Sequence, residues 1–101
     1  MTSKASVHWG RFMWDSDKEH YNKGQHGVDF RTAASAFLDP RRVVLVDERH
    51  SGIEIRRYCI GKTQEGIVTV RYTHRGDQIR IIGAGYWRKW RKLYEKQNSI
   101  P

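Results

Sequence analysis

Apolar residues recur at helical spacing in one stretch of the first half of the chain. In FRTAASAFL they stand at positions i, i+3, i+4, i+7 and i+8, counted from Phe30. Asp29 can cap this predicted helix at its N-terminus, and Pro40 ends it. The preceding segment, WDSDKEHYNKGQHGV, also predicts a helix, with Asp15 as N-cap and Gly27 as C-terminal stop. Because that segment has little apolar content, we expect its helix to be short and mostly exposed.

The second half of the chain has the apolar and β-branched runs that are typical of β-strands. Strands are predicted at residues 42–47, 54–61, 67–74 and 78–85, separated by turn-prone segments. Because the connections are short, strands that follow one another in sequence should pair antiparallel. In the last strand, alternation places Ile79 and Ile81 on one face and Arg80 on the other.

The final segment, YWRKWRKLYEK, predicts an amphipathic helix with a basic surface. Its apolar side carries Trp87, Trp90, Leu93 and Tyr94. We expect this side to pack on the sheet, rather than to stack on nucleobases or to lie on a membrane. The order of elements predicts an α+β fold with two N-terminal helices, a four-stranded antiparallel sheet and a C-terminal basic helix. We expect one domain over residues 12–96, between tails at residues 1–11 and 97–101.

The charge of the chain is uneven and narrows the choice of partner. The formal net charge is +8. Residues 1–50 carry eight Lys and Arg against seven Asp and Glu, whereas residues 51–101 carry eleven against four. This excess of cations indicates a polyanion, usually a nucleic acid, or an acidic protein partner. The alternative is a solvated basic surface that only aids solubility.

Composition argues against several other classes of protein. The chain has no apolar run near the ~20 residues that span a bilayer, and no apolar segment of a signal peptide at its start. Its one cysteine, Cys59, cannot form an internal disulfide, and we interpret it as a buried thiol in a reducing cytosol. The histidine spacings and the single cysteine predict no metal site, and no glycine-rich phosphate loop is present.

Arginines on the predicted strands are the clearest candidates for chemistry. They are Arg56, Arg57, Arg71, Arg75 and Arg80. If the strands adjoin, their guanidinium groups can gather on one face, bind a phosphodiester and stabilise a pentavalent phosphorane. The alternative is that they are exposed side chains paired with Glu54, Asp77 or water, which would contribute little.

Cleavage of RNA without a metal also needs a base for the 2′-hydroxyl and an acid for the leaving oxygen. His26, which follows the first predicted helix, is one candidate for either role, and Glu54 and Tyr86 are others. A single loop histidine is more often structural, so spacing alone leaves these assignments open.

Three motifs together resemble one family, the BrnT toxins of type II toxin–antitoxin systems. They are WDSDKEHYNKGQHGVDFRTAASAFLDP, RRYCIG and YTHRGDQIRIIGAG, and a basic helix with Tyr94 follows them. The family pattern reads approximately WDPxKxxxNxxKHGVxFxxAxxxFxDP, then RxxxIG, then TxRGxxIRIISAR. The resemblance runs from about Phe12 to Tyr94, which is most of the chain.

The resemblance implies a RelE/ParE-like fold and a cytoplasmic, metal-independent endoribonuclease that needs no cofactor and inhibits translation by cleaving RNA. It also implies a partner, a BrnA-type ribbon-helix-helix antitoxin. In that family two toxins flank an antitoxin dimer, and the heterotetramer represses its own promoter DNA. The basic half of the chain agrees equally well with RNA and with an acidic antitoxin segment.

The resemblance also implies site residues where positions match. His26 would be the general acid–base, Arg57 and Arg80 the phosphate clamps, and Glu54 a weaker catalytic candidate. We expect RNA-binding residues at Arg71, Arg75, Arg88 and Lys89.

The chain departs from the family pattern in ways that bear on activity. Gly83 and Gly85 stand where the pattern has the serine and the final arginine of IISAR. Without that arginine, the chain would be a weakened or inactive toxin that binds an antitoxin or nucleic acid, unless Tyr86 and Arg88 compensate. A third hypothesis is direct binding of duplex DNA, but the sequence has no recognisable helix-turn-helix pattern to support it.

Overall fold

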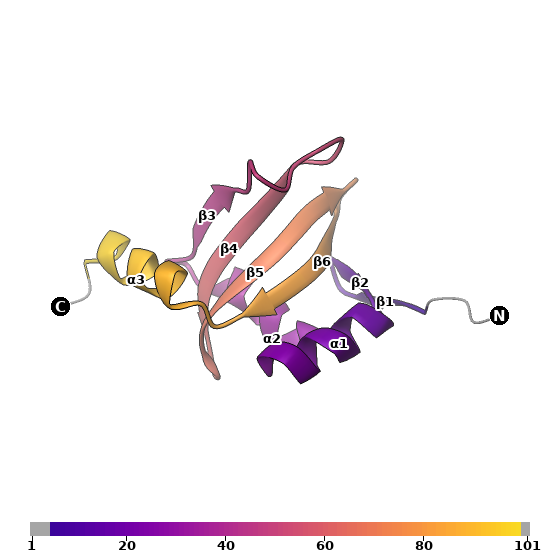
Figure 1. Ribbon diagram of the computed structural model, residues 1–101, viewed down its shortest axis with the longest axis horizontal. Coiled ribbons are helices and arrows are strands. Elements are labelled where there is room, and N and C mark those ends of the chain that lie inside the picture. The colour runs from indigo at the N-terminus through magenta and orange to yellow at the C-terminus, as the bar shows by residue number, and fades with distance from the viewer. Residues whose placement is uncertain (1–4, 100–101) are drawn as a thin grey trace.

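The computed structural model describes residues 5–99 and builds them into one sheet with helices around it (Figure 1). In chain order, the elements are β1 (Ser6–Trp9), β2 (Phe12–Asp15), α1 (Ser16–His26), α2 (Phe30–Ser35), the 3-10 helix η1 (Ala36–Leu38), β3 (Val43–Val46), β4 (Arg56–Thr63), β5 (Gly66–Arg75), β6 (Gln78–Gly85) and α3 (Arg88–Gln97). The α+β class is therefore confirmed. None of the described helices is long and apolar enough to span a bilayer.

The sheet has six strands in the order β1-β2-β6-β5-β4-β3, so the predicted four-stranded antiparallel sheet was incomplete (Figure 1). The four predicted strands pair antiparallel as expected. The addition is a hairpin of β1 and β2, whose second strand pairs with β6 in parallel. Residues 6–9 of the predicted tail thus belong to the sheet. A two-residue turn at Gly10 and Arg11 closes the hairpin, with Gly10 at φ 60°.

Three predicted helix ends are confirmed, namely both N-terminal caps and the C-terminal end of the first helix. The carboxylate of Asp15 accepts hydrogen bonds from the backbone N–H groups of Asp17 and Lys18, and that of Asp29 accepts one from Thr32. Gly27 ends α1 in the left-handed conformation, with φ 70°. The second helix is shorter than predicted, because its last turn continues as η1.

A buried amide attaches α1 to the edge of β6. The side chain of Asn22 donates to the carbonyl of Ala84 at 3.0 Å and accepts from its backbone N–H at 3.1 Å. It also donates to the carbonyl of Val28, just after the helix. Asn22 thereby supplies hydrogen bonds to a part of β6 that has no strand beside it on this edge. One side of α1 is consequently fixed next to the sheet.

The two faces of the sheet carry different residues. The main core lies on the face covered by α2, which we call the α2 face. Its buried members include Trp14, Phe30, Ala33, Cys59, Val68, Val70, Tyr72, Ile81 and Ala84. The opposite face carries Arg56, Tyr58, Arg71 and Arg80, as strand register and alternation require. We call it the arginine face.

The C-terminal helix packs on part of the arginine face, as its apolar side predicted. Trp90, Leu93 and Tyr94 pack in a second cluster with Val43 and Ile60. The hydroxyl of Tyr94 also donates to Asp39, which follows η1. Burial, then the bond to Asp39, raises the pKa of Tyr94 to about 12. Burial alone would raise the pKa of Asp39, but the Tyr94 hydroxyl and two backbone N–H groups outweigh it and lower that pKa.

Candidate active site

The arginine face brings side chains of three strands into rows. Across the sheet, Arg71 of β5 lies between Tyr58 of β4 and Gly83 of β6. In the next row, Thr73 lies between Arg56 and Arg80. Cross-strand and diagonal neighbours on one face lie within reach of long side chains. Arg56, Arg71 and Arg80 therefore lie on the same face of the sheet, as the prediction requires.

Arg57 is the exception to that prediction. It pairs with Tyr72 on β5 and Val46 on β3, and Tyr72 belongs to the core of the α2 face. Since successive residues of a strand point to opposite faces, Arg57 and Arg56 cannot both face the same ligand. The expected clamp of Arg57 and Arg80 is thus divided between the two sides of the sheet.

A groove opens beside Arg71, between α1 and the start of α3. It has a volume of about 390 Å³. Helix α1 contributes Lys18, Tyr21 and His26, the sheet contributes Arg71, Ile82 and Gly83, and Trp87 completes the lining with Asp15, Asp17 and Asn22. His26, predicted from sequence to be an acid–base candidate, is exposed here and lies 5.2 Å from the Trp87 ring, centroid to centroid. The groove combines two cations, a histidine and aromatic rings with the carboxylates of Asp15 and Asp17.

Arg71 has an unsatisfied donor. Its Nε is buried and has no hydrogen-bond partner within the part of the chain that the structure describes. Its Nη2 lies 3.8 Å from the Asp47 carboxylate, which is a long ion pair, and its side chain is 30% exposed. Leaving a buried charged donor unpaired is costly. The rest of the side chain is partly exposed and lines the groove, so Arg71 is a candidate ligand for an anion bound there.

Asp47 connects Arg71 to a second histidine. The carboxylate of Asp47 is 4% exposed and lies 2.9 Å from Nδ1 of His50. Burial alone would raise the pKa of Asp47, but hydrogen bonds from His50 and Tyr58 outweigh it and lower that pKa. A carboxylate at one imidazole nitrogen orients the ring and leaves the other nitrogen for proton transfer. His50 is partly exposed and is therefore a second acid–base candidate.

Sequence reasoning missed His50 and Asp47. The signal available was their spacing of three residues in a turn-prone segment, where a carboxylate can bond to the residue three positions later. That spacing is common in turns and does not by itself indicate proton transfer.

The remaining predicted site residues lie outside the groove. Glu54 precedes β4 and pairs with Nε of Arg75 at 2.7 Å, so the alternative of a paired strand arginine is correct for Arg75. Arg88 and Lys89 are exposed in the first turn of α3, and Lys89 lies 4.7 Å from the Trp90 ring centroid. Cys59 is fully buried, and burial raises its thiol pKa to about 12, so it is a structural residue.

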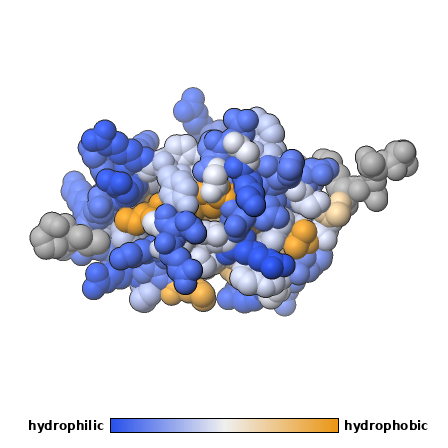
Figure 2. Space-filling model, turned by 90° about the horizontal axis from the view of Figure 1, so that it is seen from below, coloured by the Kyte–Doolittle hydropathy of each residue, from blue (hydrophilic) through white to orange (hydrophobic). Residues whose placement is uncertain are grey.

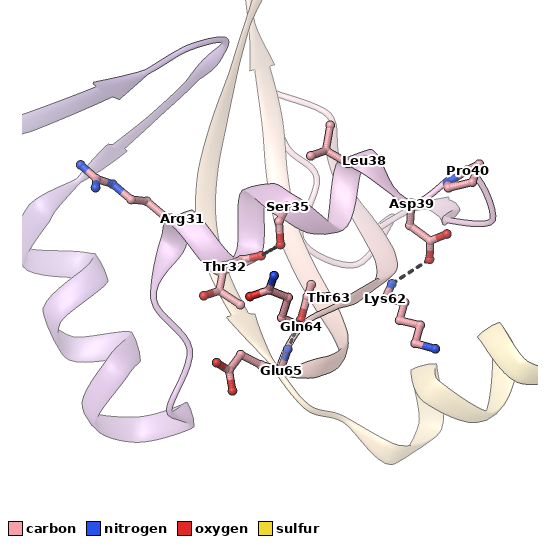
Figure 3. Close-up of a pocket in the computed structure, with 10 residues that line it drawn as sticks. All are labelled: Arg31, Thr32, Ser35, Leu38, Asp39, Pro40, Lys62, Thr63, Gln64 and Glu65. Atoms are coloured by element: carbon pink, nitrogen blue, oxygen red, sulfur yellow. Dashed lines mark hydrogen bonds between the residues drawn. The ribbon is translucent and has the colours of Figure 1, made fainter.

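A second hollow, of about 720 Å³, lies between α2 with η1 and the hairpin of β4 and β5 (Figure 3). Asp39 and Thr63 line it, and both accept hydrogen bonds from backbone N–H groups there (Figure 3). No residue predicted to act on RNA lines it.

Figure 2, which views the molecule from below, shows a mainly hydrophilic surface with small, separate apolar patches. Neither the second hollow nor these patches hold the residues predicted to act on RNA, so the groove at Arg71 is kept as the candidate site.

Among residues 5–99, no three side chains of the His, Cys, Asp or Glu type lie close enough together to hold an ion. The acid–base candidates His26 and His50 are instead accompanied by arginines and by Asp47.

A comparison with protein families gives a match to most of the chain. The model described as "Ribonuclease toxin, BrnT, of type II toxin-antitoxin system" matches residues 14–90. The match extends from the end of β2 into α3, so it includes the groove and the arginine face. A search of curated proteins found none that matches.

Proposed function

The chain belongs to the BrnT family of ribonuclease toxins of type II toxin–antitoxin systems. We therefore propose that it is a metal-independent endoribonuclease that binds the reacting phosphate of RNA at Arg71. The observation that carries this proposal is the partly exposed side chain of Arg71, which lines a groove together with Lys18 and His26 and lies 3.8 Å from the Asp47 carboxylate. A phosphate in this place would receive charge-assisted hydrogen bonds in a partly dehydrated site, where they are strongest.

The reaction follows from the groups on this face. One histidine takes the proton of a ribose 2′-hydroxyl, and the 2′-oxygen bonds to the adjacent phosphorus. Arg71 and Arg80 stabilise the negative charge of the phosphorane. The bond from phosphorus to the 5′-oxygen then breaks, and a second histidine donates a proton to that oxygen. The products are a 2′,3′-cyclic phosphate and a 5′-hydroxyl.

His26 and His50 are our candidates for the two proton transfers. His26 lines the groove with Arg71, and His50 is held by the Asp47 carboxylate, which lies 3.8 Å from Nη2 of Arg71. Arg57 and Glu54 have no direct role in this proposal, because one lies on the α2 face and the other pairs with Arg75. Arg88 and Lys89 follow Trp87 directly and are proposed to bind the RNA backbone beyond the groove.

The proposed partner is a BrnA-type ribbon-helix-helix antitoxin in a heterotetramer that binds promoter DNA through the antitoxin. The family match supports an antitoxin partner. Edge strand β3 supports it further, since Val44 and Val46 are 47% and 51% exposed there, and exposed apolar groups at a sheet edge suit a protein partner. We propose a RelE-like mode of action in the bacterial cytoplasm, where cleavage of RNA would inhibit translation.

Expression in bacteria tests this proposal. The wild-type chain should arrest growth within a few generations, and a ribbon-helix-helix protein encoded beside it should restore growth when co-expressed. The Arg71→Ala chain, expressed to the same level, should not arrest growth. If the wild-type chain accumulates to that level with no effect on growth but still binds the antitoxin, the toxin proposal fails, and the alternative of an inactive binding module is correct.

A further inference from the structure

Trp87 differs from the other aromatic residues of the C-terminal segment. The side chains of Trp90 and Tyr94 belong to the apolar cluster on β3 and β4, as the sequence predicted. Trp87 belongs to neither core cluster and lines the groove beside Arg71 instead. It is partly exposed and caps the N-terminus of α3 without a side-chain hydrogen bond. Core packing and helix capping therefore do not explain this tryptophan.

The ring of Trp87 lies directly against the backbone of Gly85. A Cβ atom at Gly85 would stand only 2.7–2.9 Å from three carbons of the six-membered ring. Real Cβ atoms do not approach a ring so closely, so any larger residue at position 85 must displace the indole. Gly85 is thus the residue that allows the ring to line the groove. The arginine that the family pattern has at this position would collide with the ring.

Gly83 provides a useful contrast. A Cβ atom at this position would lie 3.5 Å from Oδ1 of Asn22, which is ordinary contact. Its glycine leaves open space above the sheet next to Arg71. Gly83 therefore leaves room in the groove, and Gly85 allows the Trp87 ring to line it.

The lining around Trp87 suits a nucleobase next to a phosphate. Tyr21 is 70% exposed at the groove, and the His26 ring is inclined by 59° to the indole. Lys18 and Arg71 supply positive charge in the same groove. Single-stranded RNA is commonly bound by stacking its bases on aromatic rings while cations hold its backbone.

We propose that Trp87 is a stacking platform for one RNA base, adjacent to the phosphate site at Arg71. This inference rests on the proposed function and adds a base-binding subsite to it. Gly85 and Trp87 act as a pair: the glycine makes room, and the indole takes the space of a side chain at position 85. The chain thus binds a base by stacking where the family pattern has a guanidinium.

An RNA analogue with one missing base separates stacking from packing. The ligand is a short single-stranded oligonucleotide with 2′-O-methyl groups, which block cleavage, and an abasic nucleotide is placed at each position in turn. In wild-type protein, one position should lose affinity by about 5- to 100-fold when its base is removed. With Trp87→Ala, the intact oligonucleotide should bind more weakly by a similar factor, and the abasic change should have no further effect. Trp87→Phe should keep most of the base effect.

Two further variants complete the experiment. Gly85→Ala keeps the indole but displaces it, so it should also weaken the base effect. Trp9→Ala removes a tryptophan that is 43% exposed on β1, outside the groove, and should leave the base effect unchanged. If Trp87→Ala weakens the intact and abasic oligonucleotides equally, Trp87 is a packing residue and the inference is wrong. If the two losses are equal but the wild-type chain cleaves RNA, the base-binding subsite is rejected and the proposed function stands. If the wild-type chain binds no RNA, the proposed function is rejected as well.

Discussion

Replacing Arg71 with alanine is expected to slow RNA cleavage by about 10²- to 10³-fold. The guanidinium lies on the arginine face beside the groove, with a buried donor that the described residues do not satisfy. Removing it takes away a charge-assisted contact that is strongest when charge develops on the phosphorane. The measurement is the cleavage rate of a short RNA by purified protein under single-turnover conditions.

Two matched variants make this result specific. Arg71→Lys keeps the charge but loses the planar fork, so its rate should fall between those of wild type and Arg71→Ala. Arg57→Ala removes an arginine of the neighbouring strand on the α2 face, and its rate should change by less than about threefold. An equal loss in Arg57→Ala, with a folded protein confirmed by its melting temperature, would contradict the assignment of the arginine face.

Replacing Gly61 with alanine is expected to lower the melting temperature by roughly 5–20 °C, from an overpacking cost of about 1–3 kcal/mol. Gly61 is buried on β4, and a Cβ atom there would lie only 2.3 Å from the backbone carbonyl oxygen of Ala36. Because that oxygen belongs to the backbone of η1, it cannot turn away as a side chain does. The helix would have to move off the sheet. Thermal unfolding followed by circular dichroism measures the effect.

Gly24→Ala is the control for that variant. Gly24 lies within α1, and a Cβ atom there meets no described atom within 4 Å beyond the backbone of its own helix and its chain neighbours. Alanine should therefore stabilise the protein by about 0.5–1 kcal/mol and raise its melting temperature. A Gly61→Ala protein that melts at or above the wild-type temperature would show that η1 does not pack against β4 in this way.

The parts of the fold with strong local signals were predictable. The strand at residues 78–85 coincides with β6, and the caps Asp15 and Asp29 were identified because short side-chain acceptors favour the first turn of a helix. The hairpin of β1 and β2 was missed because each strand has only four residues. Moreover, β1 is mostly exposed, so it lacks the apolar alternation that marks a longer strand.

The candidate site was only partly predictable, because register decides which residues meet. His26 and Arg80 were selected from sequence, and they lie at the groove and on the arginine face respectively. A shift in the pairing of β5 with β6 places Gly83 opposite Arg71, whereas simple alternation from Ile81 would turn it toward the core. The glycines in this strand indicate a bulge or a tight exit from the strand, but not which residue the bulge shifts.

Long-range contacts account for the other differences. Asp47 reaches Arg71 from the end of another strand, and the two residues are far apart in sequence. From sequence, Gly85 indicates the loss of the arginine in the family pattern, whereas in the structure the ring of Trp87 occupies the space of a side chain at position 85. In both cases the sequence contained the residues but not their separation in space.

The most direct test of the central claim is the chemistry of the RNA ends. A short RNA is incubated with purified protein in excess EDTA, and the fragments are identified by mass spectrometry. Attack by the 2′-hydroxyl at the Arg71 site predicts a 2′,3′-cyclic phosphate on one fragment and a 5′-hydroxyl on the other. Intact RNA, or fragments that carry a 5′-phosphate and a 3′-hydroxyl, would contradict the account.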